Sequence, residues 1–228
     1  MVDLSLFGDR RFTVALGILT VSTLTLFGMT YFTAQYLQLV AGYSPLEAGL
    51  WMLVPLLTGI MTTLFASGLA QRVPTAAPMI GGLAVATAGF SALTQVDVVS
   101  GVPTLIVGLM FAFAGLLPVS TLATDLVVGA APPERAGAAS AVSETATELG
   151  GALGVAVLGS VGTAVYRHRL AESGLLPAET PGTLGDAATH ITAAYEAFVA
   201  GLRAGAVGAT ALVVVAMLAV AVLLRGTR

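Results

Sequence analysis

The sequence contains no cysteine and very little charge, and both absences exclude whole classes of protein. Without cysteine, the chain of 228 residues can form neither a disulfide framework nor a thiolate metal site. Charged residues make up 9% of the chain, whereas an ordinary soluble domain carries about 25%. Together with an apolar fraction of 57% and a mean hydropathy of +0.95, this scarcity places the chain in a membrane rather than in water.

Histidine is scarce as well, and its placement gives no metal-binding pattern. His168 and His190 both fall in one polar stretch and have no companion ligands at metal-site spacing. The apolar segments contain no Ser/His pair, no metal cluster and no phosphate-binding loop. We therefore expect no enzymatic activity, no metal site, no cofactor and no nucleic-acid partner.

Long apolar runs are what the chain has in abundance. A bilayer core of about 30 Å is crossed by a helix of about 20 apolar residues. Six uncharged runs come close to or exceed that length, and the fifth extends back to about Gly137 once two glutamates are admitted. The runs are Phe12–Leu46, Ala48–Gln71, Val73–Val96, Val98–Thr124, Leu149–Tyr166 and Ala204–Leu224. The sequence thus predicts an all-α membrane protein with six transmembrane helices.

Polar stretches divide these predicted spans. Residues 1–11 form a short polar segment, residues 12–166 hold the first five spans, and residues 204–228 hold the sixth span and a polar tail. Residues 167–203 form the one extended polar connection. Within it, apolar side chains recur at helical spacing: Ile191, Tyr195, Phe198 and Leu202. This stripe predicts a short amphipathic helix that rests on the outer membrane surface.

The connection before the second span has the signature of a helix start. Residues 42–47 read GYSPLE, with Ser44 placed to cap the helix and Pro45 at its first position. The second span is therefore predicted to begin at about Leu46.

Arginine supplies all nine cations of the chain, and its distribution predicts the orientation. One side of the predicted bundle holds six of them: Arg10, Arg11, Arg72, Arg135, Arg225 and Arg228. The other side holds Arg167, Arg169 and Arg203. Cytoplasmic loops are the more basic ones in membrane proteins. We therefore expect a lipid-embedded, multi-pass protein of the cell membrane, plasma or inner, with both termini in the cytoplasm.

The fifth predicted span carries two carboxylates, Glu144 and Glu148, one helical turn apart and hence on one face. Asp125 lies near the end of the fourth span, at a depth similar to that of Glu144 if a tight turn joins the two helices. Ionisable groups at membrane depth are costly and are functional candidates by default. These carboxylates could bind protons or attract a cationic substrate. Alternatively, Glu144, Asp125 and even the deeper Glu148 reach water at the interface and have no role.

Beyond these carboxylates, the fifth span is built from small residues. Gly150 and Gly154 repeat at the spacing that allows two helices to approach closely. We therefore expect a tight contact between this helix and a neighbour.

Two glutamines lie near the far end of the first predicted span. Gln35 and Gln38 are three residues apart, so a helix places them on one face. They either line a substrate cavity or lie in the interfacial zone, and the sequence leaves both alternatives open.

Three runs of sequence resemble one known family. They are QYLQLVAGYSPLEAG at residues 35–49, PPERAGAASAVSET at residues 132–145 and ELGGALGVAVLGS at residues 148–160. They resemble the major facilitator superfamily, and specifically its fourteen-helix branch of drug:proton antiporters, which export quaternary ammonium compounds, dyes and other lipophilic cations. The run from Gly68 to Arg72, GLAQR, is similar to the superfamily's cytoplasmic loop motif but lacks its usual Asp.

The resemblance implies half of a transporter. The chain matches the last six of the family's fourteen helices, so it is expected to form one six-helix half-bundle. The implied function is proton-coupled efflux of lipophilic or cationic drugs, with protons or cations bound at Glu148, Glu144 and Asp125. The implied partners are protons, small lipophilic cations and either an N-terminal half-transporter or a second copy. The alternative is a truncated, non-transporting membrane remnant or an assembly subunit.

Overall fold

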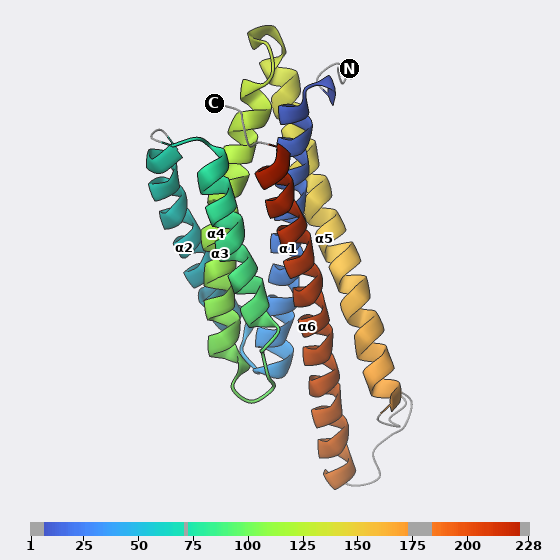
Figure 1. Ribbon diagram of the computed structural model, residues 1–228. Helices are drawn as coiled ribbons and strands as arrows, with labels where there is room; N and C mark the ends of the chain where they lie inside the picture. Colours follow the sequence, from blue (N-terminus) through green and yellow to red (C-terminus); the bar gives the residue numbers. More distant parts are fainter. Residues whose placement is uncertain (1–6, 71–72, 173–183, 224–228) are drawn as a thin grey trace.

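The computed structural model describes residues 7–70, 73–172 and 184–223, and this part of the chain is helical without any strand. Six long α-helices run alternately up and down, so that α1 begins and α6 ends at the same end of the bundle (Figure 1). We call this the terminal end and the opposite one the distal end. The helices are α1 (Arg10–Gln35), α2 (Pro45–Ala70), α3 (Ala76–Leu93), α4 (Gly101–Gly129), α5 (Ala136–Glu172) and α6 (Leu184–Leu223).

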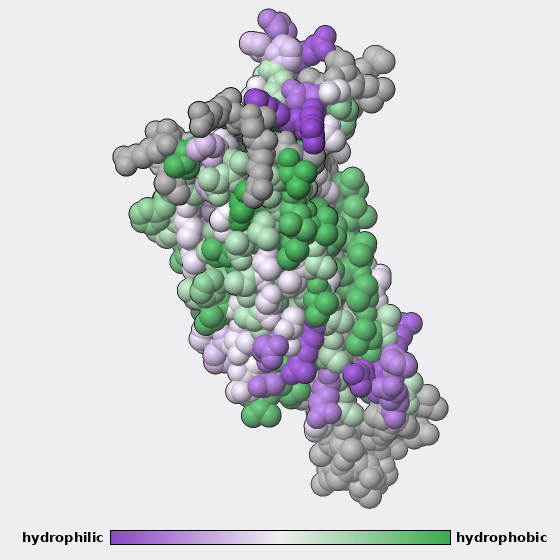
Figure 2. Space-filling view, viewed as in Figure 1, coloured by the Kyte–Doolittle hydropathy of each residue, from purple (hydrophilic) through white to green (hydrophobic). Residues whose placement is uncertain are grey.

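All six helices are long and apolar enough to cross a membrane. Figure 2 shows apolar residues over the middle of one face and hydrophilic residues gathered at its two ends. This distribution is typical of a protein whose middle lies in lipid and whose ends lie in water. The predicted fold class, an all-α membrane protein with six spans, is confirmed.

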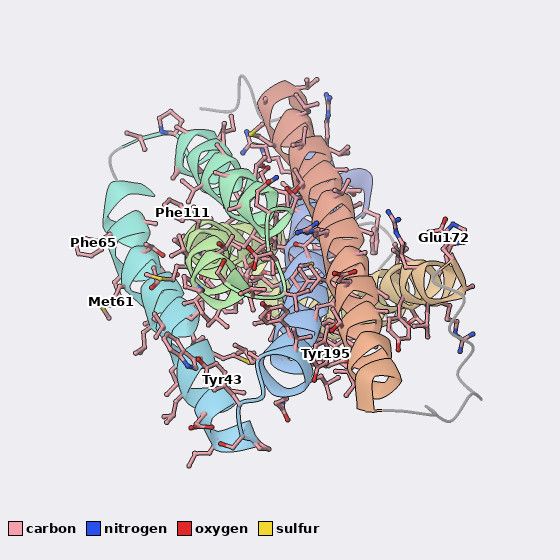
Figure 3. The ribbon with its side chains drawn as sticks, turned by 90° about the horizontal axis from the view of Figure 1, so that it is seen from below. Tyr43, Met61, Phe65, Phe111, Glu172 and Tyr195 are labelled. Atoms are coloured by element: carbon pink, nitrogen blue, oxygen red, sulfur yellow. The ribbon has the colours of Figure 1, made fainter. Side chains whose placement is uncertain are left out.

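The central pair of helices is α1 and α4, which pack against each other. Both α3 and α6 lie on one side of this pair, where they also contact each other. The remaining two helices are flanking ones: α5 packs along α1, and α2 packs along α4 (Figure 3). In this arrangement, α2 and α5 each retain a broad exposed apolar surface.

Glycines set the close approach of α1 and α5. A Cβ atom added to Gly28 of α1 would lie 2.7 Å from the carbonyl oxygen of Gly154 in α5. A Cβ atom on Gly150 would meet the hydroxyl of Thr23, and one on Gly154 would overlap the backbone of Leu24. Any larger residue at these positions would push the helices apart, so the tight contact predicted from the glycine spacing is confirmed.

The start of α2 is held by the predicted cap. The backbone N–H and the hydroxyl of Ser44 both donate to the Glu47 carboxylate, at 2.9 and 2.8 Å, and the N–H of Glu47 lies 3.3 Å from the Ser44 hydroxyl oxygen. These reciprocal hydrogen bonds form a capping box that satisfies N–H groups with no partner inside the helix.

At the distal end the helices are longer than the sequence predicted. The fifth helix continues to Glu172, where an ion pair of 3.4 Å joins Glu172 to Arg169. The sixth helix begins at Leu184, so the amphipathic stripe is its first part rather than a separate surface helix. Leu202 is buried, and Phe198 lies edge-to-face against Phe32 of α1. Hydropathy marks the part of a helix that lies in lipid, whereas helical hydrogen bonds continue through the polar residues beyond it.

Candidate functional site

The two glutamates of α5 are exposed and share one stripe of the helix. Among the residues that the structure describes, neither Glu144 nor Glu148 forms a hydrogen bond or an ion pair. The stripe continues at helical spacing through Gly151, Val155 and Gly159. Glu148 lies twelve residues after Ala136, which places it about 18 Å along the helix at 1.5 Å per residue.

Exposed aromatic side chains of α1 lie beside this stripe. A Cβ atom on Gly151 would lie 3.4 Å from the ring of Phe27, and one on Gly159 would lie 4.0 Å from the ring of Tyr31. Phe27 is 53% exposed and Tyr31 is 44% exposed. We call this surface of α1 and α5 the carboxylate face, defined by Glu144, Glu148, Phe27 and Tyr31. It carries negative charge toward the terminal end and aromatic rings toward the distal end.

Asp125 does not belong to the carboxylate face. Its neighbour Val127 is buried in a small cluster with Phe12 of α1 and Ala139 of α5. Two residues correspond to about 200° around a helix, so Asp125 lies on the side of α4 turned away from α5. The prediction that Asp125 and Glu144 lie at similar depth concerns only their positions along the helix axes. It does not bring the two carboxylates together.

The two glutamines of the first span also separate. Gln35 lines a cleft at the distal end, whereas Gln38 is exposed and its amide donates to the carbonyl of Ala34 at 3.2 Å. Between them begins a π-helical turn, Tyr36–Val40. A π-turn holds more residues than an α-turn, so the side chains on its two sides do not keep the α-helical register.

The cleft that contains Gln35 lies between α1, α5 and α6 and has a volume of about 380 Å³. Most of its walls are aromatic, aliphatic or small side chains, and none of the lining residues is charged. The lining residues are Tyr31, Phe32, Gln35, Leu39, Val40, Gly159, Gly162, Thr163, Tyr166, Ala194, Tyr195 and Phe198. We call it the distal cleft. The sequence named Gln35 as a possible cavity residue, but not its partners, because the lining residues come from three helices whose packing no local pattern predicts.

Of the run that resembles the superfamily loop motif, residues 68–72, the structure describes only the first three residues. Gly68 lies in the last turns of α2, near the terminal end, and a Cβ atom there would meet nothing within 4 Å. Arg72 lies outside the described residues. Among the described side chains, no group of three His, Asp or Glu residues is arranged to hold a metal ion.

A model of the family described as Major Facilitator Superfamily matches residues 3–155. The chain belongs to the major facilitator superfamily. With six helices able to span a bilayer, this superfamily member is a multi-pass membrane protein.

Proteins similar to this chain carry names that refer to drug efflux or drug resistance. The chain is 35% identical over 181 residues to the multidrug efflux pump LfrA of Mycolicibacterium smegmatis, an alignment that covers 79% of this chain and 36% of the pump. It is 29% identical over 245 residues to the multidrug resistance protein Stp of Mycobacterium tuberculosis, covering 96% of this chain and 45% of that protein. The methyl viologen resistance protein SmvA of Salmonella typhimurium is 34% identical over 161 residues, covering 70% of this chain and 32% of its own length.

These comparisons confirm the resemblance to drug-exporting members of the superfamily. They also show that the chain spans between 32% and 45% of the length of these three relatives.

Proposed function

We propose that this chain is the C-terminal half of a proton-coupled efflux transporter for lipophilic and cationic compounds, which works with an N-terminal half. The observation that carries the proposal is the pair Glu144 and Glu148, exposed and unpaired within the described residues on a helix of membrane length. The names of the relatives, which refer to multidrug efflux and to methyl viologen resistance, support the same substrate class.

The chemistry of the pair suits an exchange of protons for cations. Once a partner surface covers the carboxylate face, an ionised carboxylate there becomes costly. Either a proton or a cationic substrate can neutralise it, and binding of one favours release of the other. In this proposal Glu148, deeper along α5, exchanges the proton, and Glu144 adds negative charge on the path toward it. Asp125 has no part in the exchange because it faces away from α5.

The exposed apolar surfaces of the flanking helices support a partner bundle. Large hydrophobic side chains of α2, among them Leu57, Leu64 and Phe65, are 54%, 66% and 79% exposed. On α5, Leu149 and Val157 are 53% and 47% exposed. In a complete transporter, a second bundle and lipid would share these surfaces. We place the terminal end, with Arg10, Arg11 and Arg135, on the cytoplasmic side of the cell membrane.

A second candidate function is a membrane subunit or remnant that inserts and folds but does not transport. It predicts insertion without substrate-driven proton movement, whichever partner is supplied.

The test is ethidium-driven dissipation of a proton gradient in everted membrane vesicles. The vesicles contain this chain alone, or this chain with the part of LfrA that lies outside the matched segment. We expect a signal with the pair, its loss in Glu148→Gln, and its retention in Asp125→Asn, the matched removal of a carboxylate on the other side of α4. If Glu148→Gln transports like the unchanged chain, the assignment of Glu148 is wrong. An inserted pair that gives no signal supports the non-transporting alternative.

A further inference from the structure

The distal cleft is separate from the carboxylate pair. Gly159, on its wall, lies eleven residues beyond Glu148, which is about 16 Å along α5. Figure 3 looks onto the distal end, where Tyr195 lies between α6 and the end of α1. The proposed exchange at Glu148 therefore gives this cleft no role.

Aromatic rings form one wall of the cleft and hold one another in place. The ring of Phe32 lies edge-to-face against Tyr31, with centroids 6.1 Å apart, and against Phe198, with centroids 6.3 Å apart. Tyr166 and Tyr195 add two further rings from α5 and α6. The face of an aromatic ring is electron-rich and attracts organic cations.

Two features of the backbone open this space. Gly162 has no side chain, and a Cβ atom there would overlap the ring of Phe32. The π-helical turn Tyr36–Val40 brings Leu39 and Val40 to the cleft. Turns of this kind are rare and are frequently found at functional sites.

The lining residues are all uncharged, and a few of them are polar. No charged side chain lines the cleft, so an anion would find no cationic partner there. Gln35, Thr163 and the tyrosine hydroxyls are the polar groups that line it. Arg167 lines a neighbouring cleft of about 450 Å³ that shares Tyr31, Gly159 and Thr163 with this one. A volume of about 380 Å³ lies within the range of about 300–1,000 Å³ that small-molecule pockets occupy.

We infer that the distal cleft is a second binding site, for flat lipophilic organic cations, at the end of the bundle opposite the termini. The substrate class rests on the proposed function, whereas the location rests on the cleft itself. Tyr166 and Tyr195 stack on the ligand, and Phe32 and Phe198 complete the aromatic lining. The delocalised positive charge of the ligand meets ring faces instead of a carboxylate.

The first experiment measures ethidium binding to the purified chain in lipid nanodiscs by the rise in ethidium fluorescence. A Glu144→Gln/Glu148→Gln background removes the carboxylate pair, so the remaining binding reports the cleft. We expect Tyr166→Ala and Tyr195→Ala each to weaken this binding about three- to tenfold, as loss of a cation–π contact would. Tyr195→Phe keeps the ring and should bind within about twofold of its parent. Phe111→Ala removes an aromatic side chain of α4, 49% exposed and absent from the cleft, and should change nothing.

A second measurement tests the charge of the ligand. Arg167→Gln removes a nearby positive charge and should strengthen ethidium binding by up to about twofold at low salt. Binding of uncharged phenanthridine, the ring system of ethidium, should not respond to this change. If neither tyrosine-to-alanine change weakens ethidium binding, or if phenanthridine binds as tightly as ethidium, the cation site does not exist. The proposed function fails on a different result, namely a proton signal that Glu148→Gln leaves unchanged. The two proposals can therefore fail separately.

Discussion

Tyr36, in the π-helical turn after α1, donates its hydroxyl hydrogen to the backbone carbonyl oxygen of Asp97, with 2.6 Å between the two oxygens. Asp97 lies in the turn that joins α3 to α4, and the side chain of Tyr36 is fully buried. The same turn is also bound from α6, because Nε of Arg203 donates to the carbonyl oxygen of Val96 at 2.6 Å. The first and last helices therefore hold the distal end of the α3–α4 pair through its backbone.

Tyr36→Phe should destabilise the bundle by about 1 kcal/mol, because it leaves the Asp97 carbonyl without this donor while the ring stays packed. Tyr43→Phe is the matched control, since the Tyr43 hydroxyl has no hydrogen-bond partner within the described residues. Unfolding by sodium dodecyl sulfate in mixed micelles, followed by circular dichroism, measures the difference. Equal unfolding curves for the two variants would show that the Tyr36 hydroxyl contributes nothing to stability.

Asp97 makes the stability of this turn dependent on pH. The backbone N–H of Ser100 donates to its carboxylate at 2.6 Å, the Ser100 hydroxyl lies 3.0 Å from its second oxygen, and Arg203 is nearby. These interactions, with the backbone N–H bond the largest, lower the pKa of Asp97. A lowered carboxyl pKa means that the folded state favours the ionised form. The resulting stability is complete above the unfolded value of about 3.9 and is lost as the pH falls through the lower folded value.

We therefore expect Asp97→Asn to unfold more easily than the unchanged chain at pH 7, and the difference to shrink as the pH is lowered below about 4. Unfolding curves of both proteins between pH 7 and pH 2 measure this convergence. Ser100→Ala removes the hydroxyl but keeps the N–H donor, so it should show a smaller effect of the same sign. A constant difference between Asp97→Asn and the unchanged chain over this range would contradict a lowered pKa at Asp97.

The sequence predicted the features that local patterns determine, such as helix positions and caps. It missed the direction in which side chains point around a helix. Six apolar runs predicted the six spans, and Ser44 with Glu47 forms the capping box at the predicted helix start. Residue counting placed Asp125 and Glu144 at similar depth but could not say that they face different ways. Only the packing of Val127 against α1 and α5 decides that direction.

Of the distal cleft, the sequence predicted only that Gln35 could line a cavity, and the aromatic lining was missed for a related reason. Tyr166 ends the fifth predicted span, where aromatic residues are expected at any membrane interface, and Tyr195 lies on the predicted amphipathic helix. Their meeting depends on α5 and α6 continuing past the apolar runs and on the small Gly162, which lies against Phe32 and close to Gly201 of α6. Hydropathy carries no information about either condition.

Gly154→Ala is the sharpest test of the packing that positions the carboxylate face. The new methyl group would overlap the carbonyl oxygen of Leu24 and lie 2.8 Å from its carbonyl carbon. Both atoms belong to backbone and cannot rotate away, so α1 and α5 must separate, at a cost of about 1–3 kcal/mol. Because Glu148 is six residues from Gly154 on the same helix, we also expect reduced transport in any assembly that exports ethidium.

Gly17→Ala is the matched control for Gly154→Ala, because Gly17 also lies within a helix but a Cβ atom there meets nothing within 4 Å. Both changes gain helix propensity, worth up to about 1 kcal/mol. Gly17→Ala should therefore be neutral or stabilising in the same unfolding assay, whereas Gly154→Ala should be destabilising. If the two variants shift in the same direction, the close crossing of α1 and α5 does not constrain the folded state. The orientation of Glu144 and Glu148 relative to Phe27 would then lose its structural basis.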